Sequence, residues 1–348
     1  MNTPDSRPLD LLIIGAGPAG LAAACAAQSA GLRYNVVERR GPVQSLVEHP
    51  QQIRYFSPAD EMAIGGVPFP VAGGHKPTRE DALAYYRAVV QSRALDIATW
   101  EEVVAVQPIG APPFAGHFRV RSVRRVAGDG EEVSRDARFL IVCAGTFPNP
   151  RRLHSIPGGN SPKVHYRLHD PTPYFGRDVL VVGGGNSVAT AAMTLAEAGA
   201  RVTVALRRPT VDFQNHLRPF IVRDLKIMAD ENRLTVISHV SLTEITSRAV
   251  TLAPYLPYCE TDEKRERPPF SLPNDFVFAM LGHTADESLF AHLGVSLAPD
   301  GLPVYDQDTA ETAVAGLYVA GSLSRANIIL ESRRRAVEIV GEIVRKVS

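Results

Sequence analysis

A glycine-rich segment occurs twice in this chain, 168 residues apart, and this repeat limits the possible folds more than any other feature. The first copy reads LLIIGAGPAG from Leu11, and the second reads VLVVGGGNSV from Val179. In each copy, an apolar run typical of a buried parallel strand leads into a glycine turn and then into an alanine-rich stretch that predicts a helix. The sequence therefore predicts an α/β fold with two Rossmann-like domains, each able to bind a dinucleotide.

The three glycines of the first turn have separate predicted roles. Gly15 permits the tight turn, Gly17 lets a pyrophosphate approach the backbone, and Gly20 lets the helix pack closely on the strand. The helix N-terminus offers unpaired N–H groups and a partial positive charge to the phosphates. Glu38 follows 23 residues after Gly15, where a carboxylate accepts hydrogen bonds from a ribose diol. The first site is therefore expected to bind an adenosine with a free ribose, as in FAD.

The second copy has no carboxylate at the equivalent position. Subtracting 168 places Leu206 on Glu38, and Arg207 and Arg208 follow it. Arginine grips a 2′-phosphate bidentately, whereas glutamate repels it. Because two arginines also follow Glu38, the contrast depends on Glu38 against Leu206. The second site is therefore expected to prefer NADPH to NADH, and the pair of sites suggests that electrons pass from one nucleotide cofactor to the other.

Composition excludes several classes of function. The chain has 348 residues, enough for two domains, and its formal net charge of zero gives no reason to expect a nucleic-acid partner. No apolar run of ~20 residues is present to span a bilayer, and the start of the chain does not resemble a signal peptide. Cys25, Cys143 and Cys259 are far apart and form neither a C-x-x-C pair nor a metal-ligand cluster, so we expect no metal and a reducing cytoplasm.

Proline-rich segments suggest that the second domain is inserted into the first. We expect hinges at 148–162 and 268–273, with the strand 276–280 back in the first domain. The expected domains are an FAD-binding domain at 1–155 and 270–348 and an NADPH-binding domain at 163–268.

Further elements follow from local patterns. Thr78 and Asp81 form a helix start, and that helix is expected to end near Ser92. The segment 41–74 is expected to be a loop region with short elements, and the charged run 260–267 a solvated turn. Other expected elements are strands at 100–107, 118–126, 137–143 and 316–321 and a final helix at 329–347.

Strings along nearly the whole chain resemble one family of flavoproteins. Tyr85-Tyr86-Arg87 and the string from Asn274 to Met280 are the most specific of them. They are similar to the bacillithiol disulfide reductase group, whose architecture is that of thioredoxin reductase without its dithiol. The resemblance implies FAD in the outer domain, NADPH in the inserted domain, reduction of a low-molecular-weight disulfide as the small-molecule acceptor, and a homo-oligomer.

The motifs and this resemblance together give the expected cofactor residues. For FAD they are Gly15, Ala16, Gly17, Pro18, Ala19, Gly20, Glu38, Arg39, Val103, Ala144, Gly145, Gly321, Ser322 and Ile329. For NADPH they are Gly183, Gly184, Gly185, Asn186, Ser187, Arg207, Arg208 and Gly282.

The acceptor side departs from the family pattern. Members of the group typically carry a cysteine, the proposed exchange thiol, where this chain has Ala19. Ser322 stands where many relatives place an aspartate, and it offers a neutral hydrogen-bonding partner. Candidates for contact with the acceptor are Arg54, Tyr55 and Cys143, each with a purely structural role as its alternative.

Three other functions stay open at this point. The same cofactors serve reductases of quinones or of protein carriers such as ferredoxin. A flavin monooxygenase is a further alternative, although its F-x-G-x-x-x-H string is absent before the second glycine turn. The last alternative is a redox-sensing protein that holds both nucleotides without turnover.

Overall fold

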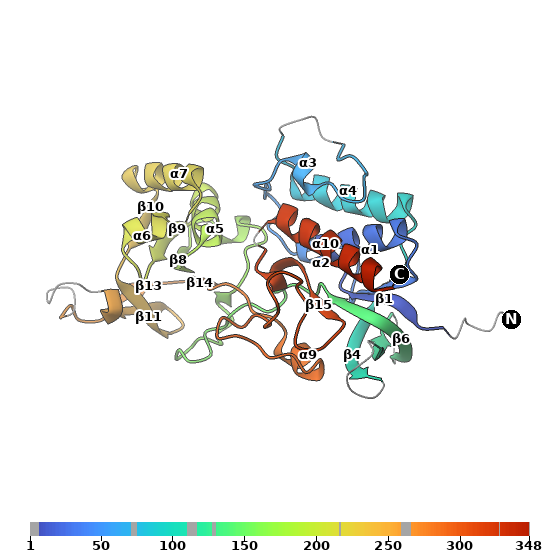
Figure 1. Cartoon of the computed structure of the whole chain (residues 1–348). Coiled ribbons are helices and arrows are strands. Elements are labelled where there is room, and N and C mark those ends of the chain that lie inside the picture. Colours follow the sequence, from blue (N-terminus) through green and yellow to red (C-terminus); the bar gives the residue numbers. More distant parts are fainter. Residues whose placement is uncertain are drawn as a thin grey trace. The chain divides into compact units, whose positions relative to one another are not determined.

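The computed structural model in Figure 1 describes residues 7–70, 75–109, 117–126, 130–215, 217–258, 266–326 and 328–347. The chain forms two compact units. The outer unit comprises Met1–Glu48, Gln52–Asn149 and Thr284–Ser348, and the inserted unit comprises Pro150–His283 together with His49–Gln51. The expected insertion of one domain into another is therefore present.

A mostly parallel sheet forms the centre of the outer unit. Its strands run in the order β3-β2-β1-β6-β5-β4, and β15 also pairs with β6. The strands β3, β2, β1, β6 and β15 are parallel, whereas β4, β5 and the first half of β6 form an antiparallel meander. Their bounds are β1 Leu9–Ile14, β2 Tyr34–Val37, β3 Ile97–Ala98, β4 Glu101–Pro108, β5 Phe118–Arg124, β6 Glu131–Val142 and β15 Leu317–Val319.

Strand β1 is buried on both faces, as its unbroken apolar run predicts. Leu11 and Ile13 belong to the core beneath α1, α4 and α10, which Figure 1 shows stacked on one side of this unit. Leu12 and Ile14 belong to a second core that includes residues of β5 and α9. The helical segments are α1 Pro18–Ser29, α2 Gln44–Val47, α3 Ala59–Met62, α4 Arg79–Ser92, α9 Glu287–His292, η3 Gly321–Ser324 and α10 Ile329–Val347.

The start of α4 has the predicted capping box. Thr78 Oγ1 accepts a hydrogen bond from Asp81 N at 3.2 Å, and the Asp81 carboxylate accepts one from Thr78 N at 2.9 Å. The helix ends at Ser92 as expected. Two donors that the first turn would leave unpaired are thus satisfied within the sequence of the cap itself.

The inserted unit contains a second parallel sheet, in the order β10-β9-β8-β14-β7. A three-stranded antiparallel sheet, β11-β12-β13, contributes to the core on one face, and α5 and α7 contact β8, β9 or β10. The strands are β7 Val164–His165, β8 Asp178–Gly183, β9 Arg201–Ala205, β10 Leu234–Ile237, β11 Val240–Ile245, β12 Ala249–Pro254, β13 Phe270–Pro273 and β14 Phe276–Met280. The helices are η1 Thr172–Tyr174, α5 Asn186–Glu197, α6 Thr210–Asn215, α7 Pro219–Asp230 and η2 Leu256–Tyr258.

The two parallel sheets repeat one topology. Helix α1 starts at residue 18 and α5 at residue 186, and both span 12 residues, so the 168-residue offset of the sequence repeat holds in space. In each sheet the first strand of the unit lies between its second strand and a strand from later in the chain. This reversal of strand order is where Rossmann-like folds open a crevice for a nucleotide.

The second boundary of the inserted unit differs from the sequence expectation. Strand β14 was expected back in the first domain, but it pairs in parallel with β8 through Val277 and Leu180. The inserted unit therefore ends at His283, not near residue 268. Asp275 fixes this pairing, because its carboxylate accepts a hydrogen bond from Asp178 N and its own N–H donates to Asp178 O. An apolar run reveals that a strand is buried, but it does not reveal in which sheet.

Other expectations have mixed outcomes. Strands occur at the four expected places, and the segment 41–74 contains only the short helices α2 and α3 in its described part, 41–70. Most of the charged run 260–267 lies outside the described residues. Across the ranges that the structure describes, no helix is both long and apolar enough to cross a bilayer.

Candidate functional site

Three parallel strands of the outer unit end at one edge of its sheet. Register pairs Ile14 of β1 with Val142 of β6, and Val142 with Val319 of β15. The residues that follow these ends are Gly15, Cys143 to Gly145, and Ala320 to Ser322. The small residues predicted to line an FAD site therefore share one edge, as expected for a nucleotide crevice.

The glycine turn of this unit leaves no room for side chains at two of its three glycines. Gly15 has φ +104°, and a Cβ placed there would lie 2.6 Å from Cys143 O. A Cβ on Gly20 would lie 1.9 Å from Gly15 O, so α1 packs on β1 only with glycine there. Around Gly17, in contrast, a Cβ would meet nothing within 4 Å. The turn is thus tight against the protein and open at the residue that should face the pyrophosphate.

The first turn of α1 is a cradle for an anion. Its N-cap, Gly17, provides no side-chain hydrogen bond, and Pro18 occupies the first turn. The N–H groups at such a helix start carry a partial positive charge. Helix α1 and the open backbone of Gly17 therefore fit the pyrophosphate of FAD.

Glu38 is held at the end of β2. Its two carboxylate oxygens accept hydrogen bonds from Ala16 N and Arg40 N, both at 2.8 Å. Each oxygen has a further lone pair, so the carboxylate can also accept from a ribose hydroxyl. Arg39 and Arg40 form ion pairs with Glu102 at 3.6 Å and with Glu48 at 3.2 Å, respectively. The arginines after Glu38 are thus engaged by carboxylates of the outer unit.

Ser322 joins two of the strand ends. Its Oγ accepts a hydrogen bond from Thr146 N at 3.0 Å and lies 3.2 Å from Thr146 Oγ1. A Cβ on Gly145, whose φ is +69°, would lie 3.5 Å from the same Oγ. Ser322 therefore fixes the loop after β6 at the predicted flavin edge. Thr146 was not predicted, although its place directly after Ala144-Gly145 was a usable signal.

The glycine turn of the inserted unit has the same form. Gly183 has φ +143°, and a Cβ there would lie 2.2 Å from Met280 O and 2.7 Å from Val188 Cγ2. Val188 occupies the place that Gly20 has in the first unit, and its side chain is fully buried. Gly185 caps α5 without a side-chain hydrogen bond, and Gly184 and Gly185 have open space around them. This turn also fits a pyrophosphate.

The end of β9 differs from the end of β2 in the predicted way. Leu206 is 1% exposed and points into the protein, whereas Arg207 and Arg208 are exposed. The Arg207 guanidinium lies 5.3 Å from the centre of the Tyr255 ring. Tyr255 lies just after β12, and no local motif in the sequence links it to β9.

Further NADPH candidates lie around the same turn. Asn186 Oδ1 accepts a hydrogen bond from Arg218 N at 3.0 Å, which ties the start of α5 to the start of α7. Gly282, with φ +82°, follows β14 and accepts from Arg151 N at 3.0 Å. Because β8 and β14 are parallel neighbours, their ends bring Gly183 and Met280 together.

The described cysteines are buried thiols. Burial raises the pKa of Cys143 to about 12 and also raises the pKa of Cys25 above its ordinary value. Cys25 Sγ would be 2.6 Å from a Cβ on Gly65, so it fills a gap in the core. Cys259 lies outside the described residues. Because the thiolate is the reactive form, the environment of Cys143 favours the packing role over an exchange role.

The remaining candidates have structural surroundings. Tyr55 is buried, its N–H donates to Pro77 O at 2.9 Å, and burial raises the pKa of its hydroxyl. Arg54 forms a bridge with Thr78 before α4. Val103 is half-buried beside the second core of the outer unit, and Ile329 begins α10.

The sequence profile of the pyridine nucleotide-disulphide oxidoreductases matches residues 12–321. The chain belongs to this family. It is 28% identical over 341 residues to the bacilliredoxin reductase Bdr of Bacillus subtilis, covering 96% of this chain and 97% of that protein. A solved structure of the bacillithiol disulfide reductase Bdr of Bacillus cereus matches with a TM-score of 0.86 and 30% identity, covering 98% of this chain and all of that one.

A second group of relatives has another printed activity. The ferredoxin–NADP reductase of Ignicoccus hospitalis is 25% identical over 323 residues, covering 91% of this chain and 90% of that protein. Together, family and fold identify this protein as an oxidoreductase with FAD and NADPH as its cofactors.

Proposed function

We propose that the protein uses NADPH to reduce a low-molecular-weight disulfide of the bacillithiol type. The observation that supports this proposal most is the similarity to Bdr proteins over nearly the full length of both chains. Two glycine turns of the required form, one followed by Glu38 and the other by Leu206, are consistent with it.

In this proposal the outer unit holds FAD, which when bound supplies the two-electron chemistry between NADPH and the acceptor. Gly17 and the start of α1 bind the pyrophosphate, and Glu38 binds the ribose diol. Ser322, itself positioned by Thr146, donates its hydroxyl hydrogen towards the flavin side of the crevice. The other residues assigned to FAD are Gly15, Ala16, Pro18, Ala19, Gly20, Arg39, Val103, Ala144, Gly145, Gly321 and Ile329.

The inserted unit holds NADPH. The start of α5 binds its pyrophosphate, and Arg207 and Arg208 bind the 2′-phosphate, with Arg207 positioned by the Tyr255 ring. Leu206 is buried and leaves no carboxylate to repel that phosphate. The other residues assigned to NADPH are Gly183, Gly184, Gly185, Asn186, Ser187 and Gly282.

The acceptor must be reduced without a thiol relay at residue 19. Ala19 lies at the start of α1, and a Cβ on Gly321 would be 3.2 Å from its methyl group. Cys143 is held as a neutral thiol by burial. We therefore assign neither residue an exchange role, and we place the acceptor next to the flavin crevice itself.

The same observation favours one second candidate, a reductase of a protein electron carrier. Ferredoxin–NADP reductases are also relatives over about nine-tenths of this chain. A carrier of this kind needs no thiol, so Ala19 is compatible with it.

The test is steady-state NADPH oxidation by the flavin-loaded protein with matched acceptors. We expect turnover with bacillithiol disulfide that exceeds turnover with ferredoxin or a quinone, and the same rate within twofold for Cys143→Ser. Cys25→Ser serves as the control for changes in packing. Preference for ferredoxin would replace the first candidate by the second, and loss of turnover in Cys143→Ser alone would contradict the thiol-free route.

We also propose that the protein acts in the cytoplasm as a homo-oligomer. The absence of a C-x-x-C pair and the resemblance to a self-associating group support these two statements. Light scattering of the purified protein tests the second, and a monomer at micromolar concentration would refute it.

A further inference from the structure

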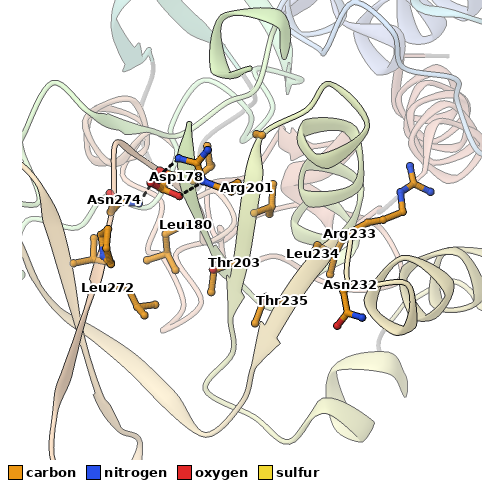
Figure 2. A pocket seen from close by; sticks show the side chains of 15 residues that line it. Asp178, Leu180, Arg201, Thr203, Asn232, Arg233, Leu234, Thr235, Leu272 and Asn274 are labelled. Carbon is orange, nitrogen blue, oxygen red and sulfur yellow. Dashed lines mark hydrogen bonds and ion pairs between the residues drawn. The ribbon is translucent and has the colours of Figure 1, made fainter. Parts of the chain in front are cut away.

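The inserted unit contains a cavity at the end of its parallel sheet opposite the glycine turn. Its volume is about 220 Å³, and its walls come from the first residues of β8, β9 and β10 together with residues of β12 and β13 (Figure 2). Strand β8 runs from Asp178 at the cavity to Gly183 at the turn, five steps of ~3.3 Å, or roughly 16 Å. The cavity is therefore separate from the residues assigned to NADPH.

Strand register places the lining side chains on one face of the sheet. Leu180, Thr203 and Thr235 are partners across β8, β9 and β10, and one step towards the strand starts Asp178 is the partner of Arg201. Because side chains alternate, this face is the one that carries Val182 of the core further along β8. The cavity thus continues the core face out to the sheet edge.

The floor of the cavity is apolar. Leu180 and Val250 are almost completely buried, and Leu272 of β13 packs beside them. Figure 2 shows Leu180 and Leu272 on the same side of the cavity. These side chains can cover a compact hydrocarbon body.

The acidic residue in the lining is already neutralised. Arg201 donates to both carboxylate oxygens of Asp178, from Nε at 2.7 Å and from Nη2 at 2.9 Å, as the dashed lines in Figure 2 show. These hydrogen bonds hold the pKa of Asp178 below its ordinary value. Arg233 adds a second guanidinium to the lining, and its ion pair with Glu231, outside the lining, is long at 3.5 Å and exposed.

Several donors around the cavity have no internal use. Among the described residues, the hydroxyls of Thr203 and Thr235 and the side-chain amide of Asn232 have no hydrogen-bond partner. Together with Arg233 they form a set of donors above an apolar floor. A carboxylate accepts from donors of this kind, whereas a cation would meet two arginines.

We propose that this cavity binds a small carboxylate with a compact apolar body. The carboxylate lies at Arg233 and the threonine hydroxyls, and the body lies against Leu180 and Leu272. The volume equals that of about seven waters at ~30 Å³ each, which suits an aromatic or branched monocarboxylate and excludes a dinucleotide. This site is independent of the proposed function.

The test uses 4-fluorobenzoate as probe and follows its ¹⁹F line width with the flavin-loaded protein. We expect saturable binding, at least fivefold weaker binding of the uncharged 4-fluorobenzamide, and no displacement of 4-fluorobenzoate by saturating NADPH. The variant R233Q/T203V should bind 4-fluorobenzoate at least fivefold more weakly. The matched control R223Q removes another exposed arginine, one on α7 paired with Asp224, and should bind as the unaltered protein does.

Three results would overturn the proposal. They are equal affinity for the benzoate and the benzamide, unchanged affinity in R233Q/T203V, and displacement of the probe by NADPH. If the double variant has a lowered melting temperature, R233Q alone decides, because the Arg233 side chain is 46% exposed and its loss leaves the core intact.

Discussion

Replacing both Arg207 and Arg208 by alanine is the most direct test of how this protein distinguishes its nucleotides. Both side chains follow a buried leucine at the end of β9, where no carboxylate competes for a 2′-phosphate. The double variant R207A/R208A should lose affinity for NADPH and leave the affinity for NADH nearly unchanged. The reason is that the two nucleotides differ only in that phosphate.

The expected size follows from the exposure of the two arginines. A hydrogen bond to a charged partner contributes about 1.5–3 kcal/mol to binding when it is shielded from solvent. Both arginines are exposed, so screening reduces this to about 1 kcal/mol each. A total of ~2 kcal/mol corresponds to a loss of roughly 30-fold in kcat/KM for NADPH.

The assay compares kcat/KM for NADPH and NADH in three proteins. The unaltered protein and R207A/R208A are compared with R223A/K226A, which removes two exposed positive charges from α7 in the same unit. Y255L adds a finer measure: it keeps both charges and removes the ring beside Arg207, so NADPH alone should lose about two- to fivefold. Equal losses for both nucleotides in R207A/R208A, or the same loss in R223A/K226A, would refute the assignment.

Two further predictions concern carboxylates of the outer unit. Glu38→Ala removes an acceptor placed by Ala16 N, so the purified protein should retain at least threefold less FAD by absorbance; full FAD content would remove Glu38 from the site. Glu101 is fully buried; burial alone would raise its pKa, but hydrogen bonds from Arg135 and Ser122 hold it below the ordinary 4.5. Its stabilising contribution is therefore present above about pH 4.5 and lost as the pH falls further. Melting temperatures measured from pH 6 to pH 3 should fall less steeply for Glu101→Gln, and parallel curves would contradict this.

Much of the site could be predicted because the signals are local. A glycine turn between a buried strand and a helix requires close backbone approach, and Gly15, Gly20 and Gly183 meet that requirement in both units. The capping box at Thr78 is likewise complete within four residues. Such patterns carry their own geometry, so the sequence is enough to locate them.

Other features depend on partners far along the chain. Thr146 meets Ser322 across 176 residues, and Tyr255 meets Arg207 with no motif to connect them. Cys143 illustrates the same limit, since its position at a strand end suggested reactivity and only its burial shows a thiol with a raised pKa.

The sequence by itself determined that this protein has two dinucleotide turns and that Glu38 and Leu206 distinguish them, because turn geometry and ribose chemistry are encoded within about 25 residues. Only the tertiary structure decided that β14 completes the inserted sheet, since strand pairing is chosen among competing apolar segments by contacts such as those of Asp275 with Asp178. It alone also brought Thr203, Arg233 and Leu272 around one cavity, because residues from three separate strands or loops become neighbours only when two sheets pack.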